Sequence, residues 1–425
     1  MRDAPRICIL SHSHPDFSKG GGEMAAWRQF HALRNAGRRP ILVAASDIGT
    51  RYAASRAIEP VMPHGEDEYI YTFAGMAEDR LVWEDPHQRR VLVEFLASLP
   101  VDVFHLHHYW RVGTDLIVDL MAARPDARFA ITMHEMLAIC LHHGQMVRTQ
   151  SRELCRAESP MRCLTCFPDQ TLERFAIRKA TLLSTLSRFD AVIHPSAFIR
   201  DRYEAWGLTR PHAAVIENYL GDEALALPRP IAPAPAAATS FGFFGSPTLF
   251  KGLDVLLRAL PLALRANPAI TLTVFGAERE EVVRLFPALD PVITEVGQAL
   301  AFAGRYDPAD AVALMGSVGW AVMPSIWWEN SPVVIQEARR AGTPLIVADI
   351  GGMAEKVLPG VDGMHFKRAS PVDLARAMAE AAAPGIRARH AESLRDVMTR
   401  DEFLAALDAA FAAGLDAAFA AGPRG

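Results

Sequence analysis

The chain has 425 residues, half of them apolar, and its 44 Lys and Arg residues are slightly outnumbered by 49 Asp and Glu residues. A chain of this length exceeds one ordinary hydrophobic core, so we expect two or three domains. The mildly acidic balance excludes a protein that is driven onto nucleic acid by its overall charge, and it favours a small-molecule partner.

The N-terminal stretch has an apolar run too short for a signal peptide, and no segment approaches the roughly 20 apolar residues that span a bilayer. We therefore expect a soluble, cytoplasmic protein. The basic segment of residues 173–189 leaves open a peripheral contact with the inner membrane, although an ordinary surface helix is the favoured interpretation.

Short apolar runs rich in Val and Ile alternate with segments of helical period along the first half, which indicates a buried parallel sheet wrapped by helices. The stretch that follows, LPRPIAPAPAAATS at residues 227–240, is rich in Pro and Ala without periodicity and is predicted to be a linker. The expected strands of the first half are residues 6–12, 39–46, 101–108, 129–135, 191–196 and 213–219.

The same alternation restarts after the linker, with expected strands at residues 241–246, 270–276, 300–304, 320–325 and 344–349. The predicted fold is therefore α/β, with two Rossmann-like, doubly wound domains that face a central cleft and bind ligands beyond the carboxyl ends of their strands. The predicted divisions are residues 1–227, a linker at 228–239, residues 240–400 and a C-terminal helix at 401–425. The repeated LDAAFAAG of that helix suits structural packing, for example against the first domain.

The stretch ENSPVVIQEA carries two carboxylates, Glu329 and Glu337, with an apolar run between them. Ser331 as N-cap and Pro332 at the first helical position predict a helix from about residue 332 to 340. Glu329 then lies in the loop before the helix, whose N-terminus offers free N–H groups to an anion. From spacing alone, two solvated glutamates are the alternative interpretation.

Two features of the first half also point to a site. Gly20, Gly21 and Gly22 form a loop between a strand and a helix, where glycine lets the backbone approach a phosphate or sugar closely; a flexible turn is the alternative. His134 ends the strand of residues 129–135, where a packed or solvated histidine is the plainer alternative.

Four of the five cysteines fall within 27 residues: Cys140, Cys155, Cys163 and Cys166. A C-x-x-C pair with two further cysteines can form a tetrahedral thiolate site for structural zinc or an iron–sulfur cluster. Reduced free thiols are the alternative, and disulfides are disfavoured by the expected compartment. A nucleic-acid zinc finger is excluded because no basic patch accompanies the loop.

Six stretches taken together resemble the family-four retaining glycosyltransferases, two-domain enzymes of the GT-B fold that take a sugar from a nucleotide-sugar donor. The resemblance extends over nearly the whole chain, and a similar cysteine-bearing loop occurs in one subgroup of the family. The stretches are KGGGE, MHE, VIENYL, FKGLDVLLRAL, VMPSIWWENSPVVIQEA and IGGMAEKV.

The resemblance implies roles for the second half of the chain. Glu337 would accept hydrogen bonds from the ribose hydroxyls of the nucleotide, and Glu329 would hold hydroxyls of the donor sugar. Asn330, Ser331 and Pro332 would place backbone amides and the helix N-terminus around the sugar and the diphosphate.

Lys251 would neutralise the departing diphosphate, by the same resemblance. One departure concerns the position after Gly245, where the family commonly has Arg and this chain has Ser246. Either Arg305 supplies a second positive charge near Ser246, or backbone amides suffice; a surface arginine is the alternative interpretation.

The first half would contribute contacts on the acceptor side. Gly21, Gly22 and Glu23 would lie near the acceptor and the donor diphosphate, and His134 would contact the donor sugar. Glu135 replaces an aspartate often found in the family. Three further histidines would line the acceptor side: His105, His107 and His108.

The expected function is that of a retaining hexosyltransferase acting on a nucleotide sugar, UDP- or GDP-linked, without an obligatory metal. The acceptor would be a saccharide or a lipid-linked compound, in assembly of a bacterial surface polysaccharide. The resemblance also implies a front-face attack in which the leaving phosphate oxygen helps take the acceptor proton. No dedicated nucleophile for the competing double displacement stands out in the sequence. The alternatives are an epimerase or a phosphorylase on the same scaffold, and a binding module that has lost transfer.

Overall fold

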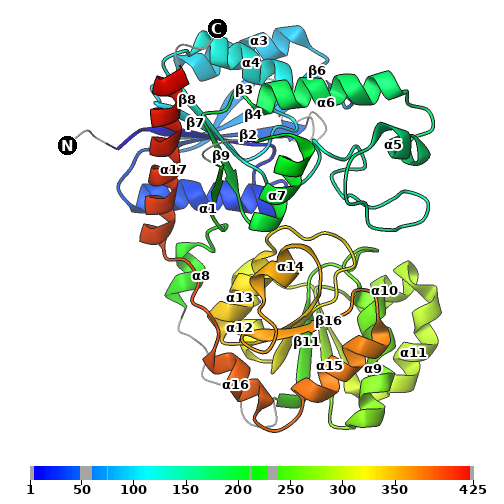
Figure 1. Ribbon diagram of the computed structural model, residues 1–425. Helices are drawn as coiled ribbons and strands as arrows, with labels where there is room; N and C mark the ends of the chain where they lie inside the picture. The colour runs from blue at the N-terminus through cyan, green and yellow to red at the C-terminus, as the bar shows by residue number, and fades with distance from the viewer. Residues whose placement is uncertain (1–3, 48–59, 74, 210–212, 228–237, 422–425) are drawn as a thin grey trace. The chain divides into compact units, whose positions relative to one another are not determined.

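A computed structural model describes residues 4–47, 60–73, 75–209, 213–227 and 238–421 (Figure 1). The chain divides into two compact units, residues 1–221 with 399–425 and residues 222–398. The boundary falls before helix α8 (Asp222–Ala226) rather than at residue 227, because Arg340 of the second unit donates to the carbonyl oxygens of Ala224 and Leu225 at 3.2 and 2.7 Å. Most of the predicted linker, residues 228–239, lies outside the described residues.

The sheet of the first unit has, within the described residues, the strand order β10-β9-β8-β7-β1-β2-β4-β3. Only β3 is antiparallel to its neighbour. All six strands predicted for this half are present: β1 (Ile7–Ser11), β2 (Ile41–Asp47), β7 (Val103–Leu106), β8 (Arg128–Thr132), β9 (Ala191–His194) and β10 (Ala213–Val215). The edge strand β3 (Val61–Gly65), its neighbour β4 (Glu68–Phe73), and the small hairpin of β5 (Met76–Ala77) and β6 (Val82–Trp83) were not predicted.

Helices cover both faces of this sheet. Helices α3, α4 and α6 pack together over one face, while α1 lies on the other face beside the C-terminal helix (Figure 1). The helices of the first unit are α1 (Gly21–Asn35), α3 (Pro86–Ser98), α4 (Thr114–Ala123), α5 (Pro160–Cys166), α6 (Leu172–Leu186), α7 (Ala197–Trp206) and α17 (Arg400–Ala421).

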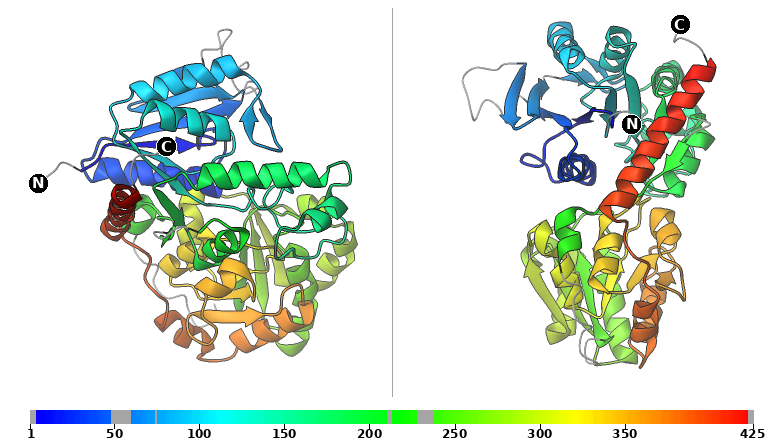
Figure 2. Two further views of the ribbon diagram at one scale, coloured as in Figure 1. Left: turned by 45° about the horizontal axis from the view of Figure 1, so that its top comes forward. Right: turned by 90° about the vertical axis from the view of Figure 1, so that its left-hand side faces the viewer.

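The C-terminal helix α17 is part of the first unit, along which it lies (red in Figure 2). Phe403 stacks on Tyr219 with ring centroids 5.3 Å apart, and Asp408 accepts a hydrogen bond of 2.7 Å from Arg38. Together these contacts close one side of the first unit's core.

The second unit has a parallel sheet of order β13-β12-β11-β14-β15-β16 in its described residues. The short strand β16 (Gly363–Phe366) was not predicted. The five predicted strands are all present: β11 (Ser240–Phe244), β12 (Thr271–Phe275), β13 (Leu300–Gly304), β14 (Trp320–Met323) and β15 (Leu345–Ala348). Its helices besides α8 are α9 (Leu253–Ala266), α10 (Arg279–Leu285), α11 (Asp290–Val296), α12 (Ala311–Gly316), α13 (Val333–Ala341), α14 (Gly351–Lys356), α15 (Pro371–Ala381) and α16 (Ile386–Glu392). Short 3₁₀ turns are η2 (Pro287–Leu289), η3 (Gly297–Ala299) and η4 (Pro308–Asp310).

Strand order locates where each sheet can bind a ligand. In the second unit the order reverses between β11 and β14, and in the first unit it reverses between β1 and β7. Ligands of open α/β sheets bind outside the carboxyl ends of the strands at such a reversal. The loops that follow these four strands are therefore the places to look for function.

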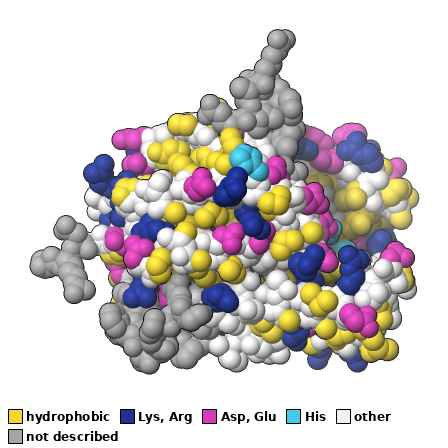
Figure 3. Space-filling view, turned by 90° about the horizontal axis from the view of Figure 1, so that it is seen from above, with side chains coloured by type: hydrophobic (Ala, Val, Ile, Leu, Met, Phe, Trp, Pro, Cys, Tyr) yellow, Lys and Arg dark blue, Asp and Glu magenta, His cyan; other side chains and the backbone are white. Residues whose placement is uncertain are grey.

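The surface agrees with the charge balance of the sequence. On the face shown in Figure 3, Lys and Arg side chains are interspersed with Asp, Glu and apolar ones. Among the described helices, none combines the length and the apolar composition needed to cross a membrane.

Candidate functional site

A close backbone approach joins the loop after β11 to the loop after β14. Gly252 has φ +69°, and a Cβ atom there would lie 1.9 Å from the carbonyl oxygen of Pro324, so only glycine fits. The Ile326 amide also donates to the carbonyl oxygen of Phe250 at 2.9 Å. Lys251, which lies between these contacts, is thereby held next to the loop that follows β14.

Lys251 and Glu329 form the central ion pair of this site. Lys251 Nζ donates to Glu329 Oε1 at 2.7 Å, and the same oxygen accepts from Ser325 Oγ and Trp327 Nε1, each at 2.9 Å. Burial opposes ionisation of the Glu329 carboxyl group, but Lys251 and these hydrogen bonds outweigh it and hold its pKa below the ordinary value. Within the described chain no residue donates to the second oxygen, Oε2, which can therefore accept a hydroxyl from a ligand.

Two glycines at the start of α14, the helix that follows β15, support the backbone of this carboxylate. The Gly352 amide donates to the carbonyl oxygen of Glu329 at 2.7 Å, and a Cβ at Gly352 would lie 1.4 Å from the carbonyl oxygen of Asn330. Gly351 has φ +61°, and a Cβ there would lie only 2.8 Å from the Glu329 carbonyl oxygen. Gly351 and Gly352 of the IGG stretch therefore allow the start of α14 to approach the loop that holds Glu329.

The start of α13 differs from the prediction in one respect. The helix begins at Val333, and its N-cap is Pro332, with ψ 123° and no side-chain cap. Because Pro332 is extended rather than helical, the predicted N-cap role of Ser331 is wrong. Ser331 Oγ is instead buried and has no hydrogen-bond partner among the described residues. A buried polar atom in this state is a place where a ligand oxygen would be favourable.

Glu337 lies within α13 and Glu329 in the loop before it, as predicted. The Glu337 side chain is buried. Burial, and then the nearby Glu337 carboxylate, raise the pKa of Tyr306 to about 12. A carboxylate and a phenol therefore lie close together on the side of α13 near the end of β13.

Ser246 and Arg305 do not form a second positive site. Ser246 is exposed at the end of β11. The Arg305 side chain is 82% exposed and pairs with Glu281 at 3.1 Å, so it lies at the surface with a carboxylate partner of its own. The suggestion that Arg305 supplies a second charge for a diphosphate is not supported by this geometry.

Gly20 is the N-cap of α1 and Gly21 and Gly22 are its first residues, so the three glycines form the start of the helix rather than the predicted loop. Gly22, Glu23 and His134 come together around His12. A Cβ at Gly22 would lie 3.2 Å from His12 Cε1 and 3.8 Å from His134 Cδ2. Glu23 accepts from Ser18 Oγ at 2.7 Å and lies 3.3 Å from His12 Nε2. Burial opposes ionisation of Glu23, but these two partners hold its pKa at about 2. The sequence interpretation missed His12.

A chain of hydrogen bonds runs inward from His134. His134 Nε2 and His107 Nδ1 are 3.0 Å apart, and His107 Nε2 lies 2.9 Å from the amide oxygen of Gln29. The amide nitrogen of Gln29 lies 2.8 Å from His105 Nδ1, and His105 Nε2 lies 2.8 Å from Thr132 Oγ1. Since the amide oxygen can only accept, His107 donates from Nε2 and accepts at Nδ1 from His134. Burial lowers the pKa of His105 and of His134 to about 3, so both rings are neutral.

His105 does not line a strand end, which corrects the prediction. Strand β7 continues to Leu106, so the His105 side chain is fully buried between the sheet and the helices, and its ring lies 5.4 Å from that of Phe411. His107 and His108 follow the strand. His108 Nε2 lies 3.3 Å from Glu135 Oε1.

Glu135 connects the end of β8 with the cysteine loop. Its Oε1 accepts from Tyr109 at 2.8 Å, and its Oε2 accepts from the Leu137 amide. Burial raises the pKa of Glu135 to about 7 despite these hydrogen bonds. A Cβ at Gly144, which has φ +71°, would lie 2.4 Å from Glu135 Oε2, so the loop folds directly over this carboxyl group.

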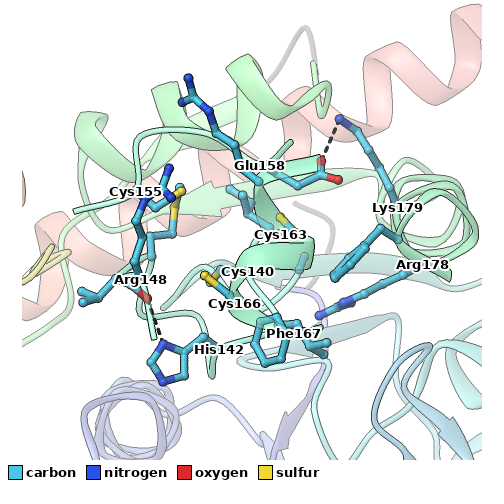
Figure 4. A pocket seen from close by; sticks show the side chains of 17 residues that line it. Cys140, His142, Arg148, Cys155, Glu158, Cys163, Cys166, Phe167, Arg178 and Lys179 are labelled. Atoms are coloured by element: carbon cyan, nitrogen blue, oxygen red, sulfur yellow. Dashed lines mark hydrogen bonds and ion pairs between the residues drawn. The ribbon is translucent and has the colours of Figure 1, made fainter. Parts of the chain in front are cut away.

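The four clustered cysteines line one hollow of about 640 Å³, including its open mouth (Figure 4). None of them forms a disulfide. No three of their sulfur atoms lie within 4.8 Å of one another; among the described residues that separation is met by the group of His14, Asp16 and His64.

Several residues that shape these sites were not found from the sequence. Ser325 and Trp327 orient Glu329, and Gln29 orders the histidine chain. The stretch PSIWWEN placed Ser325 and Trp327 within four residues of the glutamate, which was an available signal. Gln29 lies in mid-helix and carried none.

The family match to known proteins falls within the second unit of the chain. Residues 238–383 match the model of the family described as Glycosyl transferases group 1. Glycogen synthase of Mycobacterium tuberculosis is 32% identical over 152 residues, which are 36% of this chain and 36% of that protein. The chain thus matches about a third of the length of this relative.

A longer match is the D-inositol 3-phosphate glycosyltransferase of Nocardia farcinica, 26% identical over 88% of this chain and 80% of that protein. Among solved structures, Anabaena Alr3699/HepE in complex with UDP and glucose has a TM-score of 0.62 at 16% identity, covering 98% of this chain and all of that one. The sucrose-phosphate synthase of Thermosynechococcus elongatus has a TM-score of 0.60 at 16% identity, covering 97% of each chain. These likenesses confirm the predicted two-domain GT-B class of fold, and the residues that match the Glycosyl transferases group 1 model lie within the second unit.

Proposed function

We propose that the protein is a retaining glycosyltransferase that moves a hexosyl group from a nucleotide sugar to a saccharide or lipid-linked acceptor. The observation that carries this proposal is the Lys251–Glu329 pair at the strand reversal between β11 and β14. The family match of residues 238–383 covers both partners.

The two carboxylate oxygens of Glu329 have different roles: Oε1 bonds to the protein, and Oε2 is proposed to bond to the ligand. Glu329 Oε1 accepts three hydrogen bonds from Lys251, Ser325 and Trp327, which fixes the plane of the carboxylate. Oε2 would then accept hydroxyls of the donor sugar. The buried Ser331 Oγ would donate to a sugar or phosphate oxygen in the same place.

Lys251 would stabilise the charge that develops on the leaving diphosphate. Its side chain is one-third exposed, so it can turn toward a ligand, whereas Glu329 is buried and fixed. Glu337, also buried, would accept from the ribose diol. In this proposal Lys251 and backbone amides neutralise the diphosphate, and no catalytic metal is required.

The first unit would provide the acceptor side. Burial keeps His134 neutral, its hydrogen bond with His107 orients it, and Glu23 stays ionised beside Gly22. A neutral imidazole can exchange hydrogen bonds with sugar hydroxyls without a strong charge. We assign the leaving phosphate oxygen, rather than a side chain, as the group that takes the acceptor proton.

The finer parts of the proposal concern substrates and setting. The relative from Corynebacterium glutamicum is a GDP-mannose-dependent mannosyltransferase, 30% identical over 26% of this chain, and HepE was solved with UDP-glucose. We therefore propose a UDP- or GDP-hexose as donor. Assembly of a surface polysaccharide on the cytoplasmic side of the membrane is the proposed setting.

Nucleotide binding tests the donor site. The full chain is titrated calorimetrically with UDP-, GDP-, ADP- and dTDP-sugars, next to Glu337→Ala and the exposed control Glu280→Ala. We expect one base to bind, with at least tenfold weaker binding for Glu337→Ala and unchanged binding for the control. Equal binding by all three proteins would refute the assignment of Glu337. The anomeric configuration of the product, read by NMR, then tests retention.

The second candidate is a binding module that has lost transfer. It is favoured by the exposed Ser246, which stands where the family commonly has an arginine. The two candidates differ in slow donor hydrolysis. A transferase releases free sugar from the bound donor, and this release falls in Lys251→Ala. A binder holds the donor intact.

A further inference from the structure

The segment between β8 and α6 holds a site that the proposed transfer does not use. Four of the chain's five cysteines line its hollow, and they come from three separate pieces of backbone. Figure 4 shows the side chains of Cys140, Cys155, Cys163 and Cys166 arranged around a common space.

Backbone hydrogen bonds fix each piece. Cys163 and Cys166 lie one turn apart on α5, the Cys140 amide donates to the Met136 carbonyl oxygen at 2.9 Å, and the Cys155 amide donates to that of Met146 at 2.7 Å. A bridge between Val147 and Leu154 closes the turn that precedes Cys155. Each cysteine is therefore held in place by the fold of its own piece of backbone.

The hollow carries a surplus of positive charge. Arg148, Arg162, Arg178 and Lys179 line it, against a single acidic residue, Glu158, which pairs with Lys179 at 3.0 Å. A zinc ion bound by four thiolates carries a net charge of −2, which such surroundings stabilise.

The loop also holds its shape at a conformational cost. His143, Met146 and Arg152 all have positive φ, between 47° and 57°. Such conformations persist in non-glycine residues only where surrounding interactions impose them. A bound ion that joins Cys140, Cys155 and α5 would supply that constraint.

We propose that Cys140, Cys155, Cys163 and Cys166 bind one zinc ion as a structural tetrathiolate site. Four sulfur ligands suit zinc or an iron–sulfur cluster, and zinc is favoured because the proposed transfer moves no electrons. Binding of Zn²⁺ to four thiols releases four protons to the solvent. Since no three of the sulfur atoms now lie within 4.8 Å of one another, the ion also draws the three pieces closer together. The site is independent of the assignment of the donor site.

The test uses the reduced full chain, stripped with a chelator and reconstituted with Zn²⁺ alone. Zinc is measured by mass spectrometry after desalting, and Co²⁺ replaces it for spectroscopy. We expect about one zinc per chain, intense sulfur-to-cobalt charge-transfer bands, and protection of four cysteines from alkylation that is lost when the chelator is added. Cys163→Ser and Cys155→Ser should lose the metal, and Cys8→Ala should keep it.

Three results would overturn the proposal. They are no zinc retained after reconstitution, full retention in both serine variants, and the visible spectrum of an iron–sulfur cluster in the protein as isolated. His64→Ala separates the other candidate cluster, since loss of zinc in that variant alone would place the ion at His14, Asp16 and His64. The cobalt spectrum and the alkylation pattern of the unmodified chain decide the matter even where a serine variant fails to fold. Nucleotide binding is measured on the same samples, so failure of the donor site is seen separately.

Discussion

Replacing Lys251 by alanine removes the cation that lies 2.7 Å from Glu329 Oε1. Breaking a fully buried ion pair from one side costs about 3–5 kcal/mol. Lys251 is one-third exposed, and Ser325 and Trp327 continue to donate to the carboxylate, so we expect a loss of about 1–2 kcal/mol in the free energy of unfolding. The lost stabilisation of the leaving diphosphate should lower kcat by about 10²- to 10³-fold, the effect of removing one such group.

The pH dependence of this loss follows from the carboxyl group. In the native chain the Glu329 pKa lies below its ordinary value of 4.5, so the group contributes stability above pH 4.5 that is lost as the pH falls through its folded pKa. In Lys251→Ala fewer partners offset the effect of burial on Glu329, so the pKa of this carboxyl group rises. The difference in unfolding temperature between the two proteins should therefore be largest near pH 7 and should shrink toward pH 4.

The assay combines thermal unfolding from pH 4 to pH 8 with donor turnover at pH 7. Lys251→Arg keeps the charge and should retain most of the stability, and the exposed Lys367→Ala is the matched control. A difference in unfolding temperature that is constant across the pH range would refute the electrostatic reasoning. So would a kcat within threefold of the native value.

Three further predictions concern the donor loop and the histidine chain. Ser331→Ala removes a buried hydroxyl without a described partner, so unfolding temperature should stay equal or rise while KM for the donor increases several-fold; a fall in stability with unchanged KM would contradict this. Gly352→Ala places a Cβ 1.4 Å from the Asn330 carbonyl oxygen, and this steric overlap should cost about 3 kcal/mol by chemical unfolding; a stable variant with full donor affinity would show that the start of α14 can shift. Buried histidines whose pKa is lowered contribute stability that is full above pH 6.5 and is lost below it. The chain should therefore take up at least two protons on unfolding at pH 5.5, as measured from the slope of the free energy of unfolding against pH. Those histidines are His105, His107, His108 and His134.

The strands that carry the sites were predictable because parallel strands buried on both faces are nearly continuous apolar runs. Strands β3 and β16 were missed because of their local sequence. β3 contains Pro63 and exposed residues, and β16 has only four residues, GMHF, with a glycine first. Neither segment has the length or the apolar density that marks a central strand.

The site was predictable to the level of loops and not of individual hydrogen bonds. The order of Lys251 and Glu329 after two strands indicated a common edge, and the structure joins them directly. The role of Ser331 was wrong because a Ser-Pro pair is equally consistent with an extended proline as the N-cap. His105 was misplaced because the three histidines were treated together as a strand end, whereas β7 ends at Leu106 and His105 lies within it with its side chain in the core.

The position of α17 sets the order in which the chain can be completed during synthesis. The first unit is built from residues 1–221 and 399–425, so the helix that covers part of its core is translated after the whole second unit. At roughly 5–20 residues per second, that interval is on the order of ten seconds or more. During this time the surface later covered by Phe403, Leu407 and Phe411 is open, and at the end of it the second unit has all of its own residues. The second unit can therefore be the first of the two to fold on the ribosome, although its residues are made later than most of the first.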